Sequence, residues 1–177
     1  MITCPTIVIF IAMYLPFIAC SSQSCVKDII HDFEQMKVDV ARSKAAVKTA
    51  FFAALSPHFT LTGINAILKF DDVKLNRGEA YDPSTGVFTA RVPGLYHFSC
   101  MILANHGAVV HYQLNKNDQP YILGYSHKGL SADSSTISAV MELAAGDRVF
   151  IKHRHTGASE VVFGAAHTSF SGYFIAP

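Results

Sequence analysis

The stretch GLYHFSC, residues 94–100, alternates apolar and polar side chains directly after a Pro-Gly turn. Successive side chains of a β-strand point to opposite faces, so Tyr96, Phe98 and Cys100 share one face and the polar residues take the other. We therefore expect a half-buried strand here. Cys100 is expected to be a buried core thiol, because free cysteine is among the most buried residue types.

Similar runs recur through the rest of the chain and are separated by turns rich in Gly, Pro, Asn and Asp. Short runs of this kind at regular spacing predict strands and an all-β sandwich or barrel. The expected strands are residues 51–55, 65–70, 86–90, 94–104, 108–115, 120–126, 136–143, 147–153 and 168–175.

Composition excludes some classes of partner. The chain has 177 residues, 13 Phe, 7 Tyr, no Trp and a formal net charge of +1. This near-neutral charge does not indicate a protein that binds nucleic acid or an anionic membrane. We expect a partner to be bound through local chemistry.

The N-terminus has the features of a secretory signal peptide. Residues 7–19 are apolar apart from Tyr14, too few to span a bilayer, and small residues follow them. We expect a signal peptide at 1–22, cleaved within 20–24, and a secreted, extracellular protein without membrane insertion. A buried strand or a membrane anchor is the alternative, although Pro16 would interrupt a spanning helix.

Residues 25–49 carry a heptad pattern that predicts a short α-helical coiled-coil stalk. Asp32 and Asp39 fall at g and Lys37 and Lys44 at e, which favours a parallel assembly; a helix packed on its own domain is the alternative. The a and d positions are Val26, Ile29, Phe33, Met36, Val40, Ser43, Val47 and Ala50.

Cys25 immediately precedes the heptad and remains in the mature chain if cleavage falls within 20–24. With Cys100 buried, an odd cysteine at this place is suited to an interchain disulfide. We expect covalently linked chains and higher oligomers.

Aromatic residues and glycines across residues 70–98 follow the pattern F-x5-N-x4-Y-x6-F-x5-G-x-Y-x-F. This pattern resembles the signature of the complement C1q-type globular head, and Cys100 stands where the family usually has a further aromatic. The resemblance covers about residues 49–177, and the head is expected at 50–177. The pattern consists of Phe70, Asn76, Tyr81, Phe88, Gly94, Tyr96 and Phe98.

The resemblance implies a jelly-roll β-sandwich of about ten strands, related to tumour necrosis factor, that assembles as a homotrimer. Such heads have no catalytic residues and bind proteins, glycans or microbial surfaces. Residues 1–62 contain no glycine, so no collagen stalk precedes the head. The chain is similar to secreted C1q-domain proteins without a collagen stalk, and to cerebellin-type organisers.

Loops of a rigid sandwich commonly display its binding groups. Tyr125, Lys128, Arg154 and His155 supply aromatic and cationic groups that suit sugars, although they also suit plain solvated loops. His153 and His155 have a metal-compatible i, i+2 spacing, but a strand-end pair flanking an exposed Arg154 is the alternative that we favour. Repeated in a trimer, a histidine-rich surface could respond to pH near about 6.

The resemblance also implies a calcium position at Asp133, where some family members place a calcium-ligating aspartate. The companion acidic position is Tyr125 here, and a hard cation needs several oxygen ligands. An aspartate that caps a turn is the alternative. No other cofactor is expected.

No motif of a hydrolase, metalloprotease or phosphate loop occurs, so we expect no enzyme. The favoured function is lectin-like innate-immune pattern recognition, in which a trimer binds microbial or glycan surfaces by avidity. A signalling or adhesion ligand for a protein receptor and a matrix structural protein are the alternatives.

Overall fold

The protein is described by a computed structural model that covers residues 23–45, 48–64, 66–127, 132–155 and 159–177. The chain divides into two units, residues 1–46 and 47–177, and each is described here by itself. The expected signal peptide at 1–22 lies outside the described residues. In the described ranges, no helix is long and apolar enough to cross a bilayer.

The first unit contains helix α2 (Gln23–Ala45), which occupies most of the predicted stalk. Apolar side chains along it are exposed in the single chain, including Phe33 and Met36 at 53% and 57%. Ile30 and Val38, outside the a and d positions, are exposed too, so the apolar stripe is broader than the heptad seam. Pairing of this helix with other chains stays a prediction.

The heptad prediction was wrong at its C-terminal end. Ala50 lies in a strand, where it pairs with Tyr173 and Arg77. Its backbone is therefore part of the sheet of the head and does not continue the helix. Val47 lies outside the described residues. Cys25 is disulfide-bonded in this single chain, and its partner lies outside the described residues. The interchain link stays a prediction.

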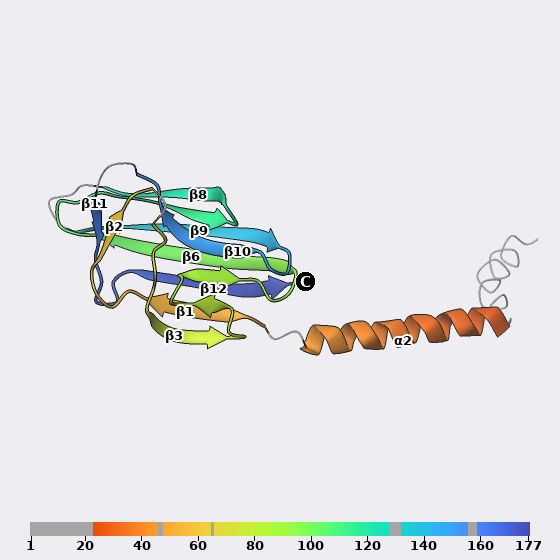
Figure 1. Ribbon diagram of the computed structural model, residues 1–177. Coiled ribbons are helices and arrows are strands. Elements are labelled where there is room, and N and C mark those ends of the chain that lie inside the picture. Colours follow the sequence, from red (N-terminus) through yellow and green to blue (C-terminus); the bar gives the residue numbers. More distant parts are fainter. Residues whose placement is uncertain (1–22, 46–47, 65, 128–131, 156–158) are drawn as a thin grey trace, which may run out of the picture. The chain divides into compact units, whose positions relative to one another are not determined.

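The second unit is a sandwich of two antiparallel sheets (Figure 1). One sheet has the order β2-β11-β6-β12-β1-β3, with β9 also paired to β6, and the other has the order β4-β5-β10-β7-β8. The strands are β1 (Ala50–Ala54), β2 (Phe59–Thr62), β3 (Asp72–Arg77), β4 (Tyr81–Asp82), β5 (Val87–Thr89), β6 (Gly94–Ala104), β7 (Val110–Lys116), β8 (Gln119–Ser126), β9 (Asp133–Leu143), β10 (Arg148–His153), β11 (Ser159–Val162) and β12 (Ser169–Ala176).

The expected alternation in β6 is confirmed. Tyr96 and Phe98 are fully buried between the sheets, and Cys100 is 1% exposed. Burial raises the pKa of the Cys100 thiol well above its ordinary value, so the thiol stays protonated and inert.

Residues of the aromatic pattern hold the sandwich together through ring packing and backbone hydrogen bonds. The Tyr81 hydroxyl donates to the Phe70 carbonyl and accepts from the Phe70 N–H, both at 3.1 Å. The Asn76 side chain donates to the Tyr81 carbonyl and accepts from its N–H. Gly94 has φ +146°, and a Cβ there would lie 2.4 Å from the Ala176 carbonyl oxygen. The residues of this aromatic pattern are therefore explained by the contacts that stabilise the fold.

One predicted strand is wrong and several short ones were missed. The described part of 65–70 makes only an isolated bridge, Ile67 to Lys152, although Leu68 and Phe70 are fully buried. The segment joins β10 at this one point, where the Leu68 N–H donates to the Ile151 carbonyl and the His153 N–H donates to the Ala66 carbonyl. The missed strands are β2, β3, β4 and β11.

Candidate ligand-binding site

Four ring side chains gather where β7, β8 and β10 meet the loops, and we call them the ring cluster: His111, Tyr125, His127 and His155. The strand register places His111 directly opposite Tyr125, with ring centroids 5.0 Å apart. His111 also stacks on His155 at 4.7 Å and 27°, and Tyr125 lies 6.1 Å from His127. The cluster offers aromatic faces beside polar nitrogens, a combination that suits a polar ring-shaped ligand.

Beneath the ring cluster, the carboxylate of Glu160 on β11 joins three segments of chain. Its Oε2 accepts the backbone N–H of His111 and lies 3.0 Å from Nε2 of His153 on β10. Its Oε1 lies 2.5 Å from Nδ1 of His111. The Glu160 side chain is only 6% exposed, so these donors replace the water that an ionised carboxylate needs.

His153 has hydrogen-bond acceptors at both ring nitrogens. Nδ1 lies 2.9 Å from the Gly63 carbonyl, which can only accept, so this nitrogen carries hydrogen. Nε2 faces the Glu160 carboxylate, which when ionised also only accepts. Both ring nitrogens of His153 are therefore engaged, one by the Gly63 carbonyl and the other by Glu160.

Electrostatics support an ionised Glu160. Burial by itself would raise the pKa of this carboxyl, but the hydrogen bonds from His111 and His153 and the charge of His111 outweigh it. The pKa of Glu160 is consequently lowered from the ordinary value of 4.5.

Two polar nitrogens beside the cluster are buried without a hydrogen-bond partner in the described parts of the chain: Nε of Arg154 and Nδ1 of His155. Buried polar atoms almost always have a partner, so an unpaired one has to be explained. The structure also corrects the expectation of an exposed Arg154, since this residue is half-buried and follows β10 directly.

The structure brings two of the predicted ligand-binding residues, Tyr125 and His155, into contact with the same His111 ring, and Arg154 directly precedes His155 in the sequence. Lys128 lies outside the described residues. His111 and Glu160 were not predicted as site residues, because their link joins positions 49 residues apart and leaves no local motif.

Among the described residues, neither of the two predicted metal sites, Asp133 and the pair His153 and His155, has a set of metal ligands. Asp133 opens β9 opposite Ala104, and its carbonyl accepts from the Ser126 hydroxyl. Strand β10 ends at His153, so the expected strand pair with His155 does not form, and His153 is engaged by Glu160. Within the described ranges, no group of three or more His, Cys, Asp or Glu could hold a metal ion. Calcium at Asp133 stays a prediction.

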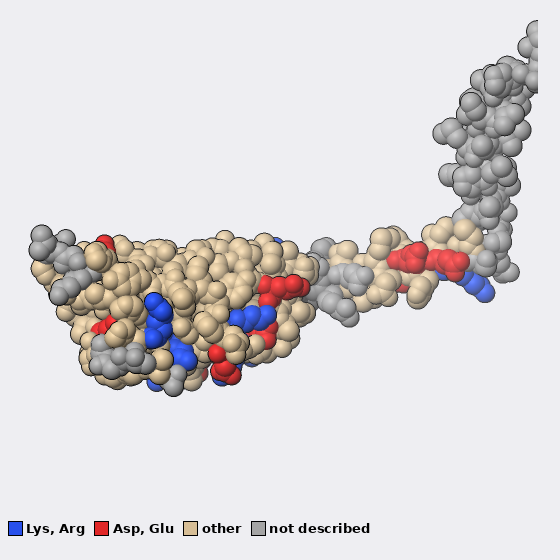
Figure 2. Space-filling model, turned by 90° about the horizontal axis from the view of Figure 1, so that it is seen from above, with Lys and Arg blue, Asp and Glu red and all other residues tan. Residues whose placement is uncertain are grey.

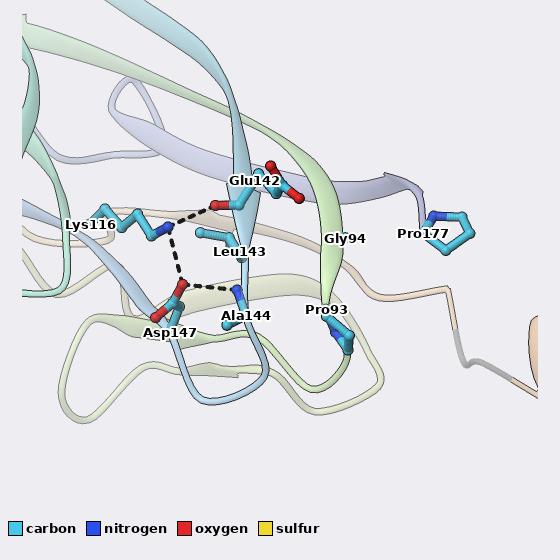
Figure 3. Close-up of a pocket in the computed structure, with 8 residues that line it drawn as sticks. All are labelled: Pro93, Gly94, Lys116, Glu142, Leu143, Ala144, Asp147 and Pro177. Atoms are coloured by element: carbon cyan, nitrogen blue, oxygen red, sulfur yellow. Dashed lines mark hydrogen bonds and ion pairs between the residues drawn. The ribbon is translucent and has the colours of Figure 1, made fainter.

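A separate hollow of about 480 Å³ lies at the end of the head near the C-terminus (Figure 3). The Lys116 ammonium there donates to the Glu142 carbonyl at 2.8 Å and pairs with Asp147 at 3.2 Å. Asp147 also accepts from the Ala144 N–H, and hydrogen bonds from Asn117 and Ala144 lower its pKa. Lys116 and Asp147 therefore pair with each other. None of the predicted ligand-binding residues lines this hollow.

The sandwich has relatives among known proteins. The family model of the C1q domain matches residues 50–175, which is nearly the whole sandwich. The chain belongs to the C1q-domain family. Mouse collagen alpha-1(X) chain is 34% identical over 132 residues, which make up 73% of this chain but only 19% of that protein.

Solved structures share the fold of this C1q domain. The globular domain of zebrafish complement 1qA protein has a TM-score of 0.57 at 18% identity, covering 73% of this chain and 97% of that chain. Murine APRIL has a TM-score of 0.56 at 10% identity, covering 72% and 99%. The expected jelly roll is therefore confirmed, and no catalytic family is indicated.

Proposed function

We propose that this protein is a secreted homotrimeric recognition protein, not an enzyme, that binds microbial or other glycan surfaces by avidity. The observation that carries the proposal is the ring cluster, in which Tyr125 is 47% exposed beside three histidines. Aromatic faces stack on sugar rings, and imidazole and guanidinium nitrogens hydrogen-bond to sugar hydroxyls.

Apolar surface on the head supports assembly with copies of itself. The outward face of the β1-β12-β6-β9 region exposes large apolar side chains, namely Phe52, Leu95, Met101, Val140, Tyr173 and Ile175. The apolar surface continues onto the edge strand β8 through Leu123 and through Tyr121, whose hydroxyl donates to the Val140 carbonyl at 3.0 Å. Large parts of the head surface in Figure 2 carry no charged side chain.

A head-to-tail contact between such heads closes into a ring when the rotation allows it. C1q and tumour necrosis factor-like domains typically form trimers, so a three-membered ring is the assembly that we propose. Three copies of a weak site on one rigid body raise the apparent affinity by about a hundredfold or more without any new contact.

The test is a glycan and microbial-polysaccharide array probed with the purified trimer, with and without calcium. We expect one glycan class to bind, and Tyr125→Ala to abolish the signal, while Lys74→Ala on β3, outside both the ring cluster and the apolar face, leaves the signal unchanged. Calcium dependence would assign Asp133 as a ligand. A blank array from a correctly assembled trimer would contradict the proposal and favour a protein receptor.

A matrix structural role is the second candidate, and the similarity to a collagen chain favours it. Self-assembly into large polymers in the absence of any ligand would support this role. Discrete trimers by light scattering would argue against it.

A further inference from the structure

We propose that neighbouring heads are joined and oriented by an ion pair between Arg77 of one head and Glu142 of the next. The partner of this surface is then a second copy of the same chain, placed in the same orientation. This inference rests on the proposed function, because it names the residues that direct the assembly of the proposed trimer.

The outward face of the sheet that contains β1, β12, β6 and β9 carries very few charged side chains. Strands β1, β6 and β12 contain no Asp, Glu, Lys or Arg. On β3, Asp72 and Lys74 pair with each other at 2.8 Å. On β9, Asp133 lies at the other end of the strand from Glu142. Arg77 on β3 and Glu142 on β9 therefore remain as the charged groups at this end of the sheet.

These two side chains lie on opposite flanks of one face. Residues that lie opposite each other in antiparallel strands point to the same face of a sheet, and so do residues two apart in one strand. Glu142 therefore shares its face with Val140, about 7 Å further along β9. Arg77 shares this face too, because one row runs across five strands and consists of Val140, His97, Tyr173, Ala50 and Arg77.

Neither charged group has a partner in its own head. Both residues are exposed, and neither the Arg77 guanidinium nor the Glu142 carboxylate makes an ion pair or a hydrogen bond to another described residue. The Lys116 ammonium takes only the Glu142 carbonyl, and the carboxylate points away from it (Figure 3). Each head thus offers one free cation on the β3 flank and one free carboxylate on the β9 flank.

Apolar side chains beside the two charges match in the same way. Phe52 and Leu75 lie opposite each other and are both exposed beside Arg77. Val140 is exposed beside Glu142. Contact between a β3 flank and a β9 flank places apolar surface on apolar surface and the cation against the carboxylate. Such complementarity fixes the register of a contact and disfavours other arrangements.

The consequence is a single direction for all heads. Contact between two different flanks is heterologous and repeats with the same rotation until the ring closes. A head turned end for end would bring Arg77 away from Glu142 and leave both charges unpaired. With all heads pointing the same way, the copies of the ring cluster lie at one height, as simultaneous binding to one surface requires.

The experiment is cross-linking of the full mature protein with a short bismaleimide, in chains that carry Cys25→Ser. Cys100 is buried and its thiol stays protonated, so only introduced thiols react. We expect Arg77→Cys combined with Glu142→Cys to give covalent trimers on a denaturing gel, and each single-cysteine variant to stay monomeric. Cross-linked dimers of a single-cysteine variant would show that like flanks meet and would overturn the inference.

Reversal of the charges measures the energy of the pair by sedimentation. Arg77→Glu and Glu142→Arg should each raise the protein concentration at which the trimer dissociates by about tenfold or more, because like charges then face each other. The chain with both substitutions should return to within about threefold of the wild-type value, which a merely misfolded variant does not do. Lys74→Glu, the same change of charge on the same strand, should leave assembly unchanged.

The two proposals fail in different ways. A wild-type protein that is monomeric by light scattering would contradict the proposed trimer itself. A trimeric wild-type protein whose double-cysteine variant gives no covalent trimer, or whose double charge reversal restores nothing, would contradict this inference alone.

Discussion

Glu160 connects β11 to β7 and β10 through hydrogen bonds to two histidines and a backbone N–H. A buried carboxylate is stable only with such partners, and here they also set the position of the His111 ring. The same residue thus stabilises the fold and orients the surface that we propose as the binding site.

Glu160→Gln should lower the free energy of unfolding by about 2 kcal/mol at pH 7, because a neutral amide cannot replace the charge-assisted bonds. The folded pKa lies below the ordinary value of 4.5, so the carboxylate stabilises the fold above about pH 4.5. This contribution is lost as pH falls through the lower folded value. Urea unfolding of the variant and of the wild-type protein at pH 7 and pH 3.5 measures it; an equal deficit at both pH values would contradict the assignment.

Tyr81→Phe should cost about 1–2 kcal/mol, because the buried N–H and carbonyl of Phe70 would both lose a partner. The ring stack of Tyr81 on Phe51, 4.7 Å between centroids, would remain. Thermal unfolding checks this against Tyr173→Phe, whose ring is 48% exposed. An unchanged melting temperature for Tyr81→Phe would show that the hydroxyl contributes nothing.

At the scale of elements, local patterns predicted the strands whose alternation is long and regular. β6 occupies the predicted residues 94–104, since its alternation runs through the full length of a strand with one face buried. β11, only four residues long, carries no recognisable period, and its place depends on pairing with β2 and β6. In the segment 65–70, Leu68 and Phe70 are buried, although the segment makes only a single bridge to β10.

The site could be predicted only in part for the same reason. Tyr125 near the end of β8 and His155 just after β10 belong to polar, aromatic stretches and could be recognised as display positions. His111 lies in a strand and Glu160 in an unrecognised one, and their contact depends on sheet order, which no local spacing reports.

Helix α2 exposes Phe33 and Met36 on the face that the heptad assigns to other chains. We expect Phe33→Lys with Met36→Lys to weaken the trimer, with dissociation at about tenfold higher protein concentration, because charged groups at core positions disfavour association. Sedimentation analysis measures this. His31→Lys at the outer f position is the control, and unchanged assembly of the double variant would mean that α2 is no coiled coil.

For the whole molecule, the apolar outer face predicts where the heads meet. Val140 on β9 is 49% exposed and lies opposite His97 of β6 on this face. Val140→Asp should give monomeric, folded heads, because a charge would be buried unpaired at the contact. Light scattering gives the mass and circular dichroism the fold; Ala145→Asp in the β9–β10 turn should remain trimeric. A trimeric Val140→Asp protein would place the interface elsewhere.

Avidity links assembly to recognition, and one measurement addresses both. Dissociation of the wild-type trimer and of the Val140→Asp monomer is recorded on the same immobilised glycan surface. The account predicts that the trimer leaves at least about a hundredfold more slowly, while both bind the free monovalent sugar equally. Equal dissociation rates for trimer and monomer would contradict recognition by avidity.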